Sequence, residues 1–276
     1  MEHAHVGYLE AKRAIDDAAF DADLLSMFRD RLPDAPTLVD LGCGTGSMLG
    51  RLLEWEITDG TYIGIDADGD VLEAAEQLRT AEARERGYEV IASADELMIG
   101  DLAVQFDQAD ALERLRAIEA PDAIVGVSFA DLVGAEPLLE AARAVATTDT
   151  QLYLPITFDD HTVFAPADRD DDAVVGAFHA AMRREGAPAV GRHLIAALDR
   201  GKGALAVGPS DWVVRPHRDG YTPAAQEFLQ HIITLIEAAV PETPTRTAWM
   251  RRRRAQMAEG ELWYIAHQYD LLYQFR

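Results

Sequence analysis

Glycines at positions 42, 44 and 46 stand close together in the segment TLVDLGCGTGS (37–47), directly after an apolar run that predicts a strand. Glycine has no Cβ, so it tolerates positive φ angles and lets the atoms of a ligand approach the backbone closely. A glycine-rich turn between a strand and a helix also presents free backbone N–H groups beside the positive end of the helix dipole. A plain strand–helix turn rarely needs more than one glycine, so this turn predicts a ligand-binding site.

The spacing of these glycines distinguishes between classes of nucleotide-binding turn. A dinucleotide-binding turn follows Gly-x-Gly-x-x-Gly, whose third glycine would fall at Ser47 and falls instead at Gly46. A P-loop ends in Gly-Lys-Ser/Thr, and this turn contains no lysine. Both phosphate-binding patterns are therefore disfavoured, and a nicotinamide-dependent oxidoreductase is retained only as an alternative. Asp66, which ends the next apolar run, can accept two hydrogen bonds from vicinal ribose hydroxyls.

Strand-like and helix-like segments alternate through the first 160 residues. Such an alternation is typical of a parallel sheet that is covered by helices on both faces. Apolar residues at helical spacing over residues 9–32 predict one or two leading helices. The patterns predict strands at 37–42, 61–67, 102–110, 121–129 and 151–159, and helices at 46–56, 70–87 and 136–146.

The alternation ends after residue 159. The polar segment 158–172 predicts a loop, and the run of aspartates within it indicates that this loop is exposed to solvent. Apolar runs at 204–214 and 262–272 can supply two further strands. We therefore expect one sheet with helical insertions, whose helices lie at 173–185, 191–201, 223–240 and about 245–259.

The segment VDLGCGTG resembles the first motif of the class I S-adenosylmethionine-dependent methyltransferases, and further motifs follow in the family's order over about the first 160 residues. The resemblance implies an α/β fold: a doubly wound, mainly parallel, seven-stranded sheet whose last two strands run antiparallel. Helices cover both faces, and helical insertions lie over the carboxyl ends of the strands. The implied parts are an N-terminal helical lid (1–34), a Rossmann-like cofactor-binding core (35–159), an insertion that caps the substrate (160–190), and a segment that completes the core (191–276) with a helical insertion at about 217–260.

The resemblance also implies S-adenosyl-L-methionine as the cofactor and S-adenosyl-L-homocysteine as its product. In the family, the residue at Asp40 helps to hold the methionine part, those at Asp110 and Ala111 read the adenine, and the loop at 128–133 lies beneath the transferred methyl group. Arg13, in the leading helix, can pair with the methionine carboxylate. The residues predicted to bind the cofactor are Asp40, Gly42, Cys43, Gly44, Gly46, Asp66, Ala67, Asp110, Ala111, Ser128, Phe129 and Arg13.

The sequence gives fewer indications of the acceptor site than of the cofactor site. An oxygen or nitrogen nucleophile often needs a general base, for which His179, His267 and Asp131 are candidates, although a lone histidine is more often structural. Lys12 either binds a carboxylate of the cofactor or acceptor, or forms an i,i+4 ion pair with Asp16 or Asp17. The candidates for contact with the acceptor are Tyr8, Lys12, Phe158, Asp211 and Trp212.

The sequence lacks the residues that several kinds of methylation require. No Asn/Asp-Pro-Pro-Tyr follows the fourth predicted strand, which argues against methylation of adenine or glutamine amides. The lone Cys43 lies inside the glycine turn, so methylation of a pyrimidine ring carbon has no nucleophile, and no cysteine-based metal site is expected. We therefore expect O- or N-methylation of a small molecule without a metal. The alternative is an RNA-directed or non-catalytic relative of the same fold.

The composition is strongly acidic, with 48 Asp and Glu against 25 Lys and Arg, a net charge of −23 and lysine at only two positions. It resembles that of proteins from extreme halophiles, in which molar salt screens the repulsion between like charges. The arginines at 251–254 spread around a helix and are expected to pair with acidic neighbours, so nucleic acid is not an expected partner. The sequence shows no signal peptide and no apolar run of about 20 residues, which predicts a soluble, cytoplasmic protein.

Overall fold

One mixed sheet runs through the computed structural model, which describes residues 6–93, 97–186 and 189–276. Residues 1–5 of the predicted lid and residues 187–188 of the predicted cap lie outside the described residues. The strands of the sheet are β1 (Thr37–Leu41), β2 (Asp59–Asp66), β3 (Val90–Ala92), β4 (Leu97–Ile99), β5 (Asp101–Gln108), β6 (Ala123–Val125), β7 (Gln151–Ala165), β8 (Ala204–Pro209), β9 (Trp212–Val214) and β10 (Trp263–Gln274).

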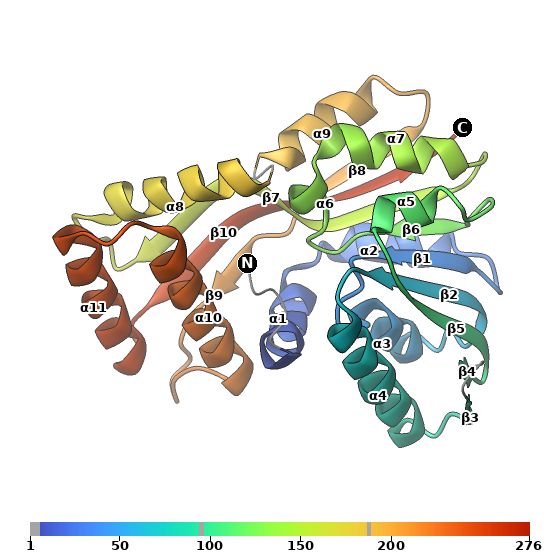
Figure 1. Cartoon of the computed structure of the whole chain (residues 1–276), viewed down its shortest axis with the longest axis horizontal. Helices are drawn as coiled ribbons and strands as arrows, with labels where there is room; N and C mark the ends of the chain where they lie inside the picture. Colours follow the sequence, from blue (N-terminus) through green and yellow to red (C-terminus); the bar gives the residue numbers. More distant parts are fainter. Residues whose placement is uncertain (1–5, 94–96, 187–188) are drawn as a thin grey trace.

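The strand order is β3-β4-β5-β2-β1-β6-β7-β10-β8, with β9 paired to β10. The strands from β5 to β7 pair in parallel, whereas β10 is antiparallel to both β7 and β8. Figure 1 shows helices on both sides of this sheet and a group of helices beyond one end of it. The helices are α1 (Val6–Ala19), α2 (Ala22–Asp30), α3 (Ser47–Glu54), α4 (Gly69–Glu85), α5 (Ala111–Leu115), α6 (Ala130–Val133), α7 (Ala135–Val145), α8 (Asp171–Glu185), α9 (Val190–Asp199), α10 (Pro223–Ala239) and α11 (Pro244–Ala258).

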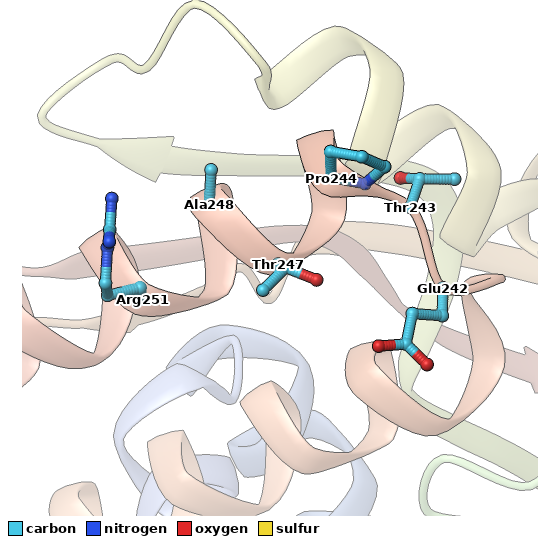
Figure 2. Close-up of a pocket in the computed structure, with 6 residues that line it drawn as sticks. All are labelled: Glu242, Thr243, Pro244, Thr247, Ala248 and Arg251. Carbon is cyan, nitrogen blue, oxygen red and sulfur yellow. The ribbon is translucent and has the colours of Figure 1, made fainter.

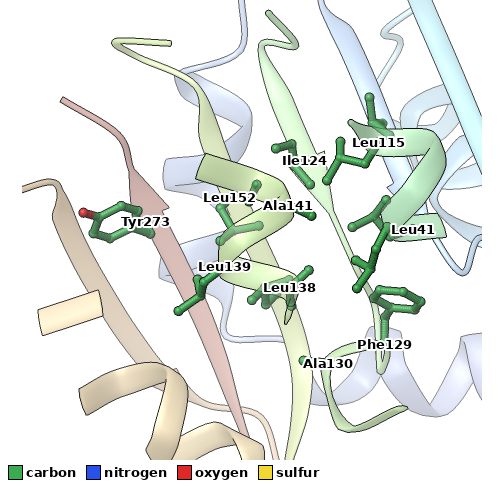
Figure 3. Close-up of a cluster of buried hydrophobic side chains, with 14 of the residues drawn as sticks. Leu41, Leu115, Ile124, Phe129, Ala130, Leu138, Leu139, Ala141, Leu152 and Tyr273 are labelled. Carbon is green, nitrogen blue, oxygen red and sulfur yellow. The ribbon is translucent and has the colours of Figure 1, made fainter. Parts of the chain in front are cut away.

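Both faces of the sheet are buried because alternate side chains of its strands are apolar in both directions. Val39 and Leu41 of β1 pack with α5, α7 and α9, in the cluster that Figure 3 shows around Leu138. Leu38, the residue before Val39, packs on the opposite face with α2, α3 and α4. The predicted doubly wound α/β fold is therefore confirmed.

The number of strands differs from the predicted seven. The additional strands are β3 and β4, a short hairpin that pairs antiparallel with β5 at the edge of the sheet, and the three-residue β9. Strands of three residues are too short to produce a period-two pattern in the sequence. The short helices α5 and α6 were likewise not predicted.

Strand β7 also continues through residues predicted as a polar loop. Asp159 is buried and accepts hydrogen bonds from the Arg192 side chain, at 2.8 and 2.9 Å. Asp160 pairs with Arg183 of α8. These partners, distant in sequence, neutralise the two carboxylates, so the polar residues are accommodated in a strand.

The second half of β7 (157–165), the first half of β10 (263–268) and β9 form an outer part of the sheet, which has its own core. This part of the sheet, together with α8, α10 and α11, is here called the extension. Phe164 and Tyr264 pack against Phe228 and Trp249, and all four are almost fully buried. Helices α10 and α11 begin alike, because Thr222 and Thr243 precede a proline and accept a backbone N–H in the first turn. The predicted insertions thus pack on the carboxyl-terminal half of β7, and α1 packs against α10 and β9 (Figure 1).

Candidate active site

A cleft of about 1070 Å³ opens at the carboxyl ends of the parallel strands. This is the edge of an open α/β sheet where ligands bind. Four strand-end segments and helix α1 line it. The lining residues are Leu9, Lys12, Arg13, Asp16, Asp40, Gly42, Cys43, Gly44, Thr45, Ser47, Asp66, Ala67, Asp68, Gly69, Asp70, Val71, Gln108, Ala109, Asp110, Ala111, Leu112, Val127, Ser128, Phe129, Leu132 and Val133.

The glycine turn forms the floor of this cleft between β1 and α3. Gly42 and Gly44 adopt φ angles of 63° and 53°, a left-handed conformation that disfavours other residues. A Cβ on Gly42 would lie 2.6 Å from Cδ2 of Phe129, so the absence of a side chain lets the turn pack against the loop after β6. Gly46 is the N-cap of α3 and, unlike the other predicted cofactor residues, does not line the cleft.

Asp66, at the end of β2, is fixed by the turn beside it. The Gly44 N–H donates to Asp66 Oδ2 at 3.0 Å, and the Asp68 N–H donates to Oδ1 at 3.1 Å. A carboxylate offers about four acceptor positions, so each oxygen retains one for a ligand. The two backbone bonds orient the carboxylate, which is only partly buried at the cleft wall.

Asp40 lies beneath the glycine turn at the end of β1. It is 2% exposed and accepts a hydrogen bond of 2.7 Å from the Tyr62 hydroxyl. Burial raises the pKa of Asp40 to about 7, although the Tyr62 hydrogen bond and the charge of Arg51 oppose this. Near neutral pH this carboxyl is therefore close to its midpoint of ionisation.

Asp110 and Ala111 follow β5 at the opposite wall. Asp110 is the N-cap of α5, and its Oδ1 accepts the Glu113 N–H at 2.8 Å. The nearby Gln108 side chain donates to the Ala67 carbonyl at 3.2 Å. The ends of the neighbouring strands β2 and β5 are therefore joined at the cleft.

The loop after β6 carries polar atoms that the protein does not pair. Ser128 has a φ angle of 51°, and its N–H donates to the Pro155 carbonyl at 3.1 Å. Ser128 Oγ and Asp131 Oδ1 are buried and have no hydrogen-bond partner among the described residues. Asp270, a residue that the sequence did not suggest, supports this loop from behind by accepting the Ile156 N–H at 2.9 Å.

Helix α1 covers the cleft and is attached to its rim by polar contacts. Glu10 accepts a hydrogen bond of 2.6 Å from the Thr45 hydroxyl in the glycine turn. Arg13 donates to Glu54 of α3 at 2.7 Å and to Glu82 of α4 at 3.0 Å. The guanidinium that was predicted to bind the cofactor thus has protein partners, and it attaches α1 to α3 and α4.

Lys12 forms the i,i+4 ion pair with Asp16 that was the alternative to a ligand contact. Its ammonium lies 5.2 Å from the ring centroid of Trp212, and the Trp212 indole N–H donates to Asp16 at 2.8 Å. One turn earlier, Tyr8 stacks on His231 with ring centroids 3.7 Å apart. Three of the predicted acceptor residues therefore gather where α1 meets β9 and α10, although only Lys12 lines the cleft.

Other predicted residues lie away from the cleft. His179 is a buried residue of the extension whose Nε2 lies 3.0 Å from the Thr162 hydroxyl, and burial lowers its pKa. Phe158 packs edge-on against it, with ring centroids 5.8 Å apart. His267 lies in β10, and its Nδ1 is 2.8 Å from Oδ1 of Asp211, which lies between β8 and β9. The structure does not bring these four side chains to the cleft.

The arginines at 251–254 are largely ion-paired. Arg252 pairs with Asp168 and Asp170, Arg253 with Asp171, and Arg254 with Glu237. The predicted pairing with acidic neighbours is confirmed for these three. A second hollow of about 480 Å³ lies at the turn into α11, where Thr243 caps the helix (Figure 2). Its lining residues are Glu242, Thr243, Pro244, Thr247, Ala248 and Arg251.

No group of three His, Cys, Asp or Glu side chains in residues 6–93, 97–186 and 189–276 could hold a metal ion. In the same residues, no helix has the length and apolar character needed to cross a bilayer.

A family model described as a methyltransferase domain matches residues 34–142. This segment contains the glycine turn, Asp66, Asp110 and the loop after β6. The chain therefore carries a methyltransferase domain, and the enzyme class predicted from the sequence is confirmed. Among curated proteins, no relative matches the chain.

Several solved structures align with most of this chain. An S-adenosylmethionine-dependent methyltransferase from Thiobacillus denitrificans, in complex with S-adenosyl-L-homocysteine, is 17% identical over 94% of this chain and 93% of that chain, with a TM-score of 0.48. YjhP from E. coli is 17% identical over 94% of each chain, with a TM-score of 0.47. Coclaurine N-methyltransferase, bound to N-methylheliamine and S-adenosyl-L-homocysteine, is 16% identical over 91% of this chain and 70% of that chain, with a TM-score of 0.47.

Proposed function

We propose that this protein transfers the methyl group of S-adenosyl-L-methionine to an oxygen or nitrogen of a small-molecule acceptor. The observation that carries the proposal is the meeting of the glycine turn, Asp66, Asp110 and Ser128 around one cleft in a chain with a methyltransferase domain. S-adenosyl-L-methionine is the methyl donor, and S-adenosyl-L-homocysteine is the product.

The residues of the cleft suit the parts of this cofactor. The Asp66 carboxylate, held by two backbone N–H groups, accepts hydrogen bonds from the ribose hydroxyls. Asp110 and Ala111 bind the adenine, and the backbone of Gly42 and Gly44 lies against the methionine and ribose parts. Asp40 supports the methionine end from beneath the turn.

Bound S-adenosyl-L-methionine supplies an electrophilic methyl group on a sulfonium. The protein contributes by positioning the acceptor in line with that methyl group and by excluding water. Phe129 packs on the glycine turn, and α1 covers the cleft. Both features reduce the access of water to the reacting atoms.

The surface favours a small acceptor over RNA. The net charge of −23 repels a polyanion, and the ion pairs of Arg252, Arg253 and Arg254 compete with phosphate for these side chains. A cytoplasmic location remains a prediction from the sequence.

Calorimetry with S-adenosyl-L-homocysteine and with NAD⁺ tests the proposal. We expect the first to bind and the second not to bind. Asp66→Ala should weaken S-adenosyl-L-homocysteine at least about a hundredfold, because two charge-assisted hydrogen bonds of about 1.5–3 kcal/mol each are lost. The matched control is Asp59→Ala, at the exposed start of the same strand, which should bind like the wild type. Binding of NAD⁺ alone, or equal affinity in both variants, contradicts the proposal.

A further inference from the structure

One side chain of the glycine turn is tied to helix α1. Thr45 lines the cleft but is only 2% exposed, and its hydroxyl donates to Glu10 of α1 at 2.6 Å. We propose that Glu10 is a positioning residue for the cofactor, which holds the glycine turn in its binding conformation through Thr45. This inference rests on the proposed methyl transfer and concerns how the same site is kept in shape.

Glu10 is itself held from the side opposite the turn. Its Oε1 accepts from Thr45, and its Oε2 accepts from Arg79 of α4, both at 2.6 Å. The Arg79 side chain is 2% exposed, and its Nη1 donates to Glu82, also at 2.6 Å. Hydrogen bonds between charged groups are stronger than neutral ones, and a group that is fixed before the ligand arrives loses little freedom on binding. A continuous series of contacts therefore runs from α4 through Glu10 to the glycine turn.

Two glycines at the start of α3 make room for this arrangement. A Cβ on Gly46 would lie 3.1 Å from Cγ of Arg79. A Cβ on Gly50 would lie 2.7 Å from Nη1 of Arg79 and 2.6 Å from Nη1 of Arg13. Gly46 does not line the cleft, so the space that it leaves is used by the arginine that supports Glu10.

The position of the turn matters for more than one part of the site. A Cβ on Gly44 would lie 3.6 Å from Cδ1 of Leu9, the residue before Glu10, so α1 lies directly over the turn here. The Gly44 N–H also donates to Asp66, the carboxylate proposed to bind the ribose, at 3.0 Å. Because Gly44 adjoins Thr45, a shift of the turn on loss of Glu10 would disturb both the backbone floor and Asp66.

A double-mutant cycle, measured by calorimetry with S-adenosyl-L-homocysteine and the full chain, tests the inference. We expect Glu10→Ala and Thr45→Val each to weaken binding about tenfold, and the double variant to bind no more weakly than either single one. Thr45→Ser keeps the hydroxyl and should bind within about twofold of the wild type. If the Thr45 hydroxyl acted on the ligand independently of Glu10, the two losses would combine to about a hundredfold, and that result overturns the inference.

The matched control is Asp17→Ala, on the same helix. Asp17 also pairs with an arginine, Arg51 of α3, at 2.7 Å, but this partner lies outside the glycine turn. The control should lower the melting temperature and keep the affinity within about threefold of the wild type. The dissociation rate of S-adenosyl-L-homocysteine, followed by stopped flow, should rise about tenfold in Glu10→Ala and stay near the wild-type value in Asp17→Ala.

The outcomes are distinguishable. Equal losses of affinity in Asp17→Ala and Glu10→Ala, or wild-type affinity in folded Glu10→Ala, overturn the inference. Should Glu10→Ala not fold, the cycle is measured with Glu10→Gln, which has one acceptor oxygen in place of two and cannot pair with Arg79 as an anion. Failure of the wild type to bind S-adenosyl-L-homocysteine in the same experiment overturns the proposed function instead.

Discussion

The cleft and the extension both contain polar side chains in apolar surroundings, but the two regions use them differently. In the extension, His179 contacts Thr162, and Asp171 accepts from both Trp249 and Arg253. Ser128 Oγ and Asp131 Oδ1 are buried without a hydrogen-bond partner among the described residues, and of these two residues Ser128 lines the cleft. The extension also contains buried atoms without a hydrogen bond, such as Asp160 Oδ1 and Arg253 Nε, but Asp160 and Arg253 form ion pairs through other atoms. The difference is that the unpaired Ser128 belongs to the lining of a cleft that can admit a ligand.

This difference shows that residue type alone is a poor guide to a site. His179 and His267 were candidates for a base because histidine titrates near neutral pH. In the structure they contact Thr162 and Asp211, and neither lines the cleft. Unused hydrogen-bonding capacity beside a cleft is the better indicator, and it can be recognised only when the partners are known.

Salt should have the largest effect, and it should affect both regions alike because the acidic surface covers both. Raising KCl from about 0.1 to 1 M shortens the screening length from about 10 to 3 Å, so repulsion within a chain of net charge −23 weakens. We expect the melting temperature, measured by circular dichroism, to rise steeply over this range. A flat profile removes the support for a halophilic protein.

Asp270→Ala should have the next largest effect, because Asp270 lies where the main sheet meets the extension. It accepts the N–H groups of Ile156 and Asp21, both at 2.9 Å, and is fully buried. Two buried donors without partners should cost about 3–5 kcal/mol of unfolding free energy, measured by urea denaturation. Asp270→Asn retains one acceptor and should cost less. Equal stability of Asp270→Ala and the wild type contradicts this role.

Asp40→Asn should change how stability depends on pH. The pKa of Asp40 is raised from 3.8 to about 7 in the folded chain, so the native state binds the proton more tightly than the unfolded state. Wild-type stability should therefore fall as the pH rises from about 4 to 7. Asn cannot ionise but still accepts from Tyr62, so at pH 8 the variant should be about 2–4 kcal/mol more stable than the wild type. The free energy of unfolding of both proteins is measured by urea denaturation at pH 5 and pH 8. An equal change between these pH values in the variant and the wild type would show that Asp40 is not the source of the pH dependence.

His179→Ala should have the smallest effect and should separate the two regions. It removes a buried contact with Thr162 and leaves a cavity in the extension, at a cost of about 1–3 kcal/mol. Thr162→Val removes the same contact and should show a comparable loss. Both variants should bind S-adenosyl-L-homocysteine within twofold of the wild type. A tenfold loss of affinity would couple the extension to the cofactor.

The sequence predicted the strand-end segments that line the cleft better than it predicted the rest of the molecule. Each part of these segments, such as the glycine turn or Asp66, is encoded within a few residues of a strand end, so pattern and spacing locate it. The continuation of β7 through Asp159 and Asp160 depends on Arg192 and Arg183, which lie at least 23 positions away. Asp270 lies 114 positions from Ile156 in the sequence, so no local pattern indicates that the two residues are hydrogen-bonded.

The same limit applies to the contacts of α1 at the cleft. Arg13 was assigned to the cofactor because it lies in a leading helix, but Glu54 and Glu82 are its partners. Conversely, Glu10 was not predicted, although it accepts from Thr45 of the glycine turn. Both contacts join α1 to segments at least 35 positions away, so neither is visible in the spacing of the sequence.

A crystal structure with bound S-adenosyl-L-homocysteine tests the central claim most directly, because it locates each part of the cofactor. We expect the ribose hydroxyls within hydrogen-bonding distance of Asp66, the adenine beside Asp110 and Ala111, and the sulfur facing the loop of Ser128. A ligand that lies elsewhere, for example in the hollow at the turn into α11, or that leaves Asp66 without a contact, would contradict the account.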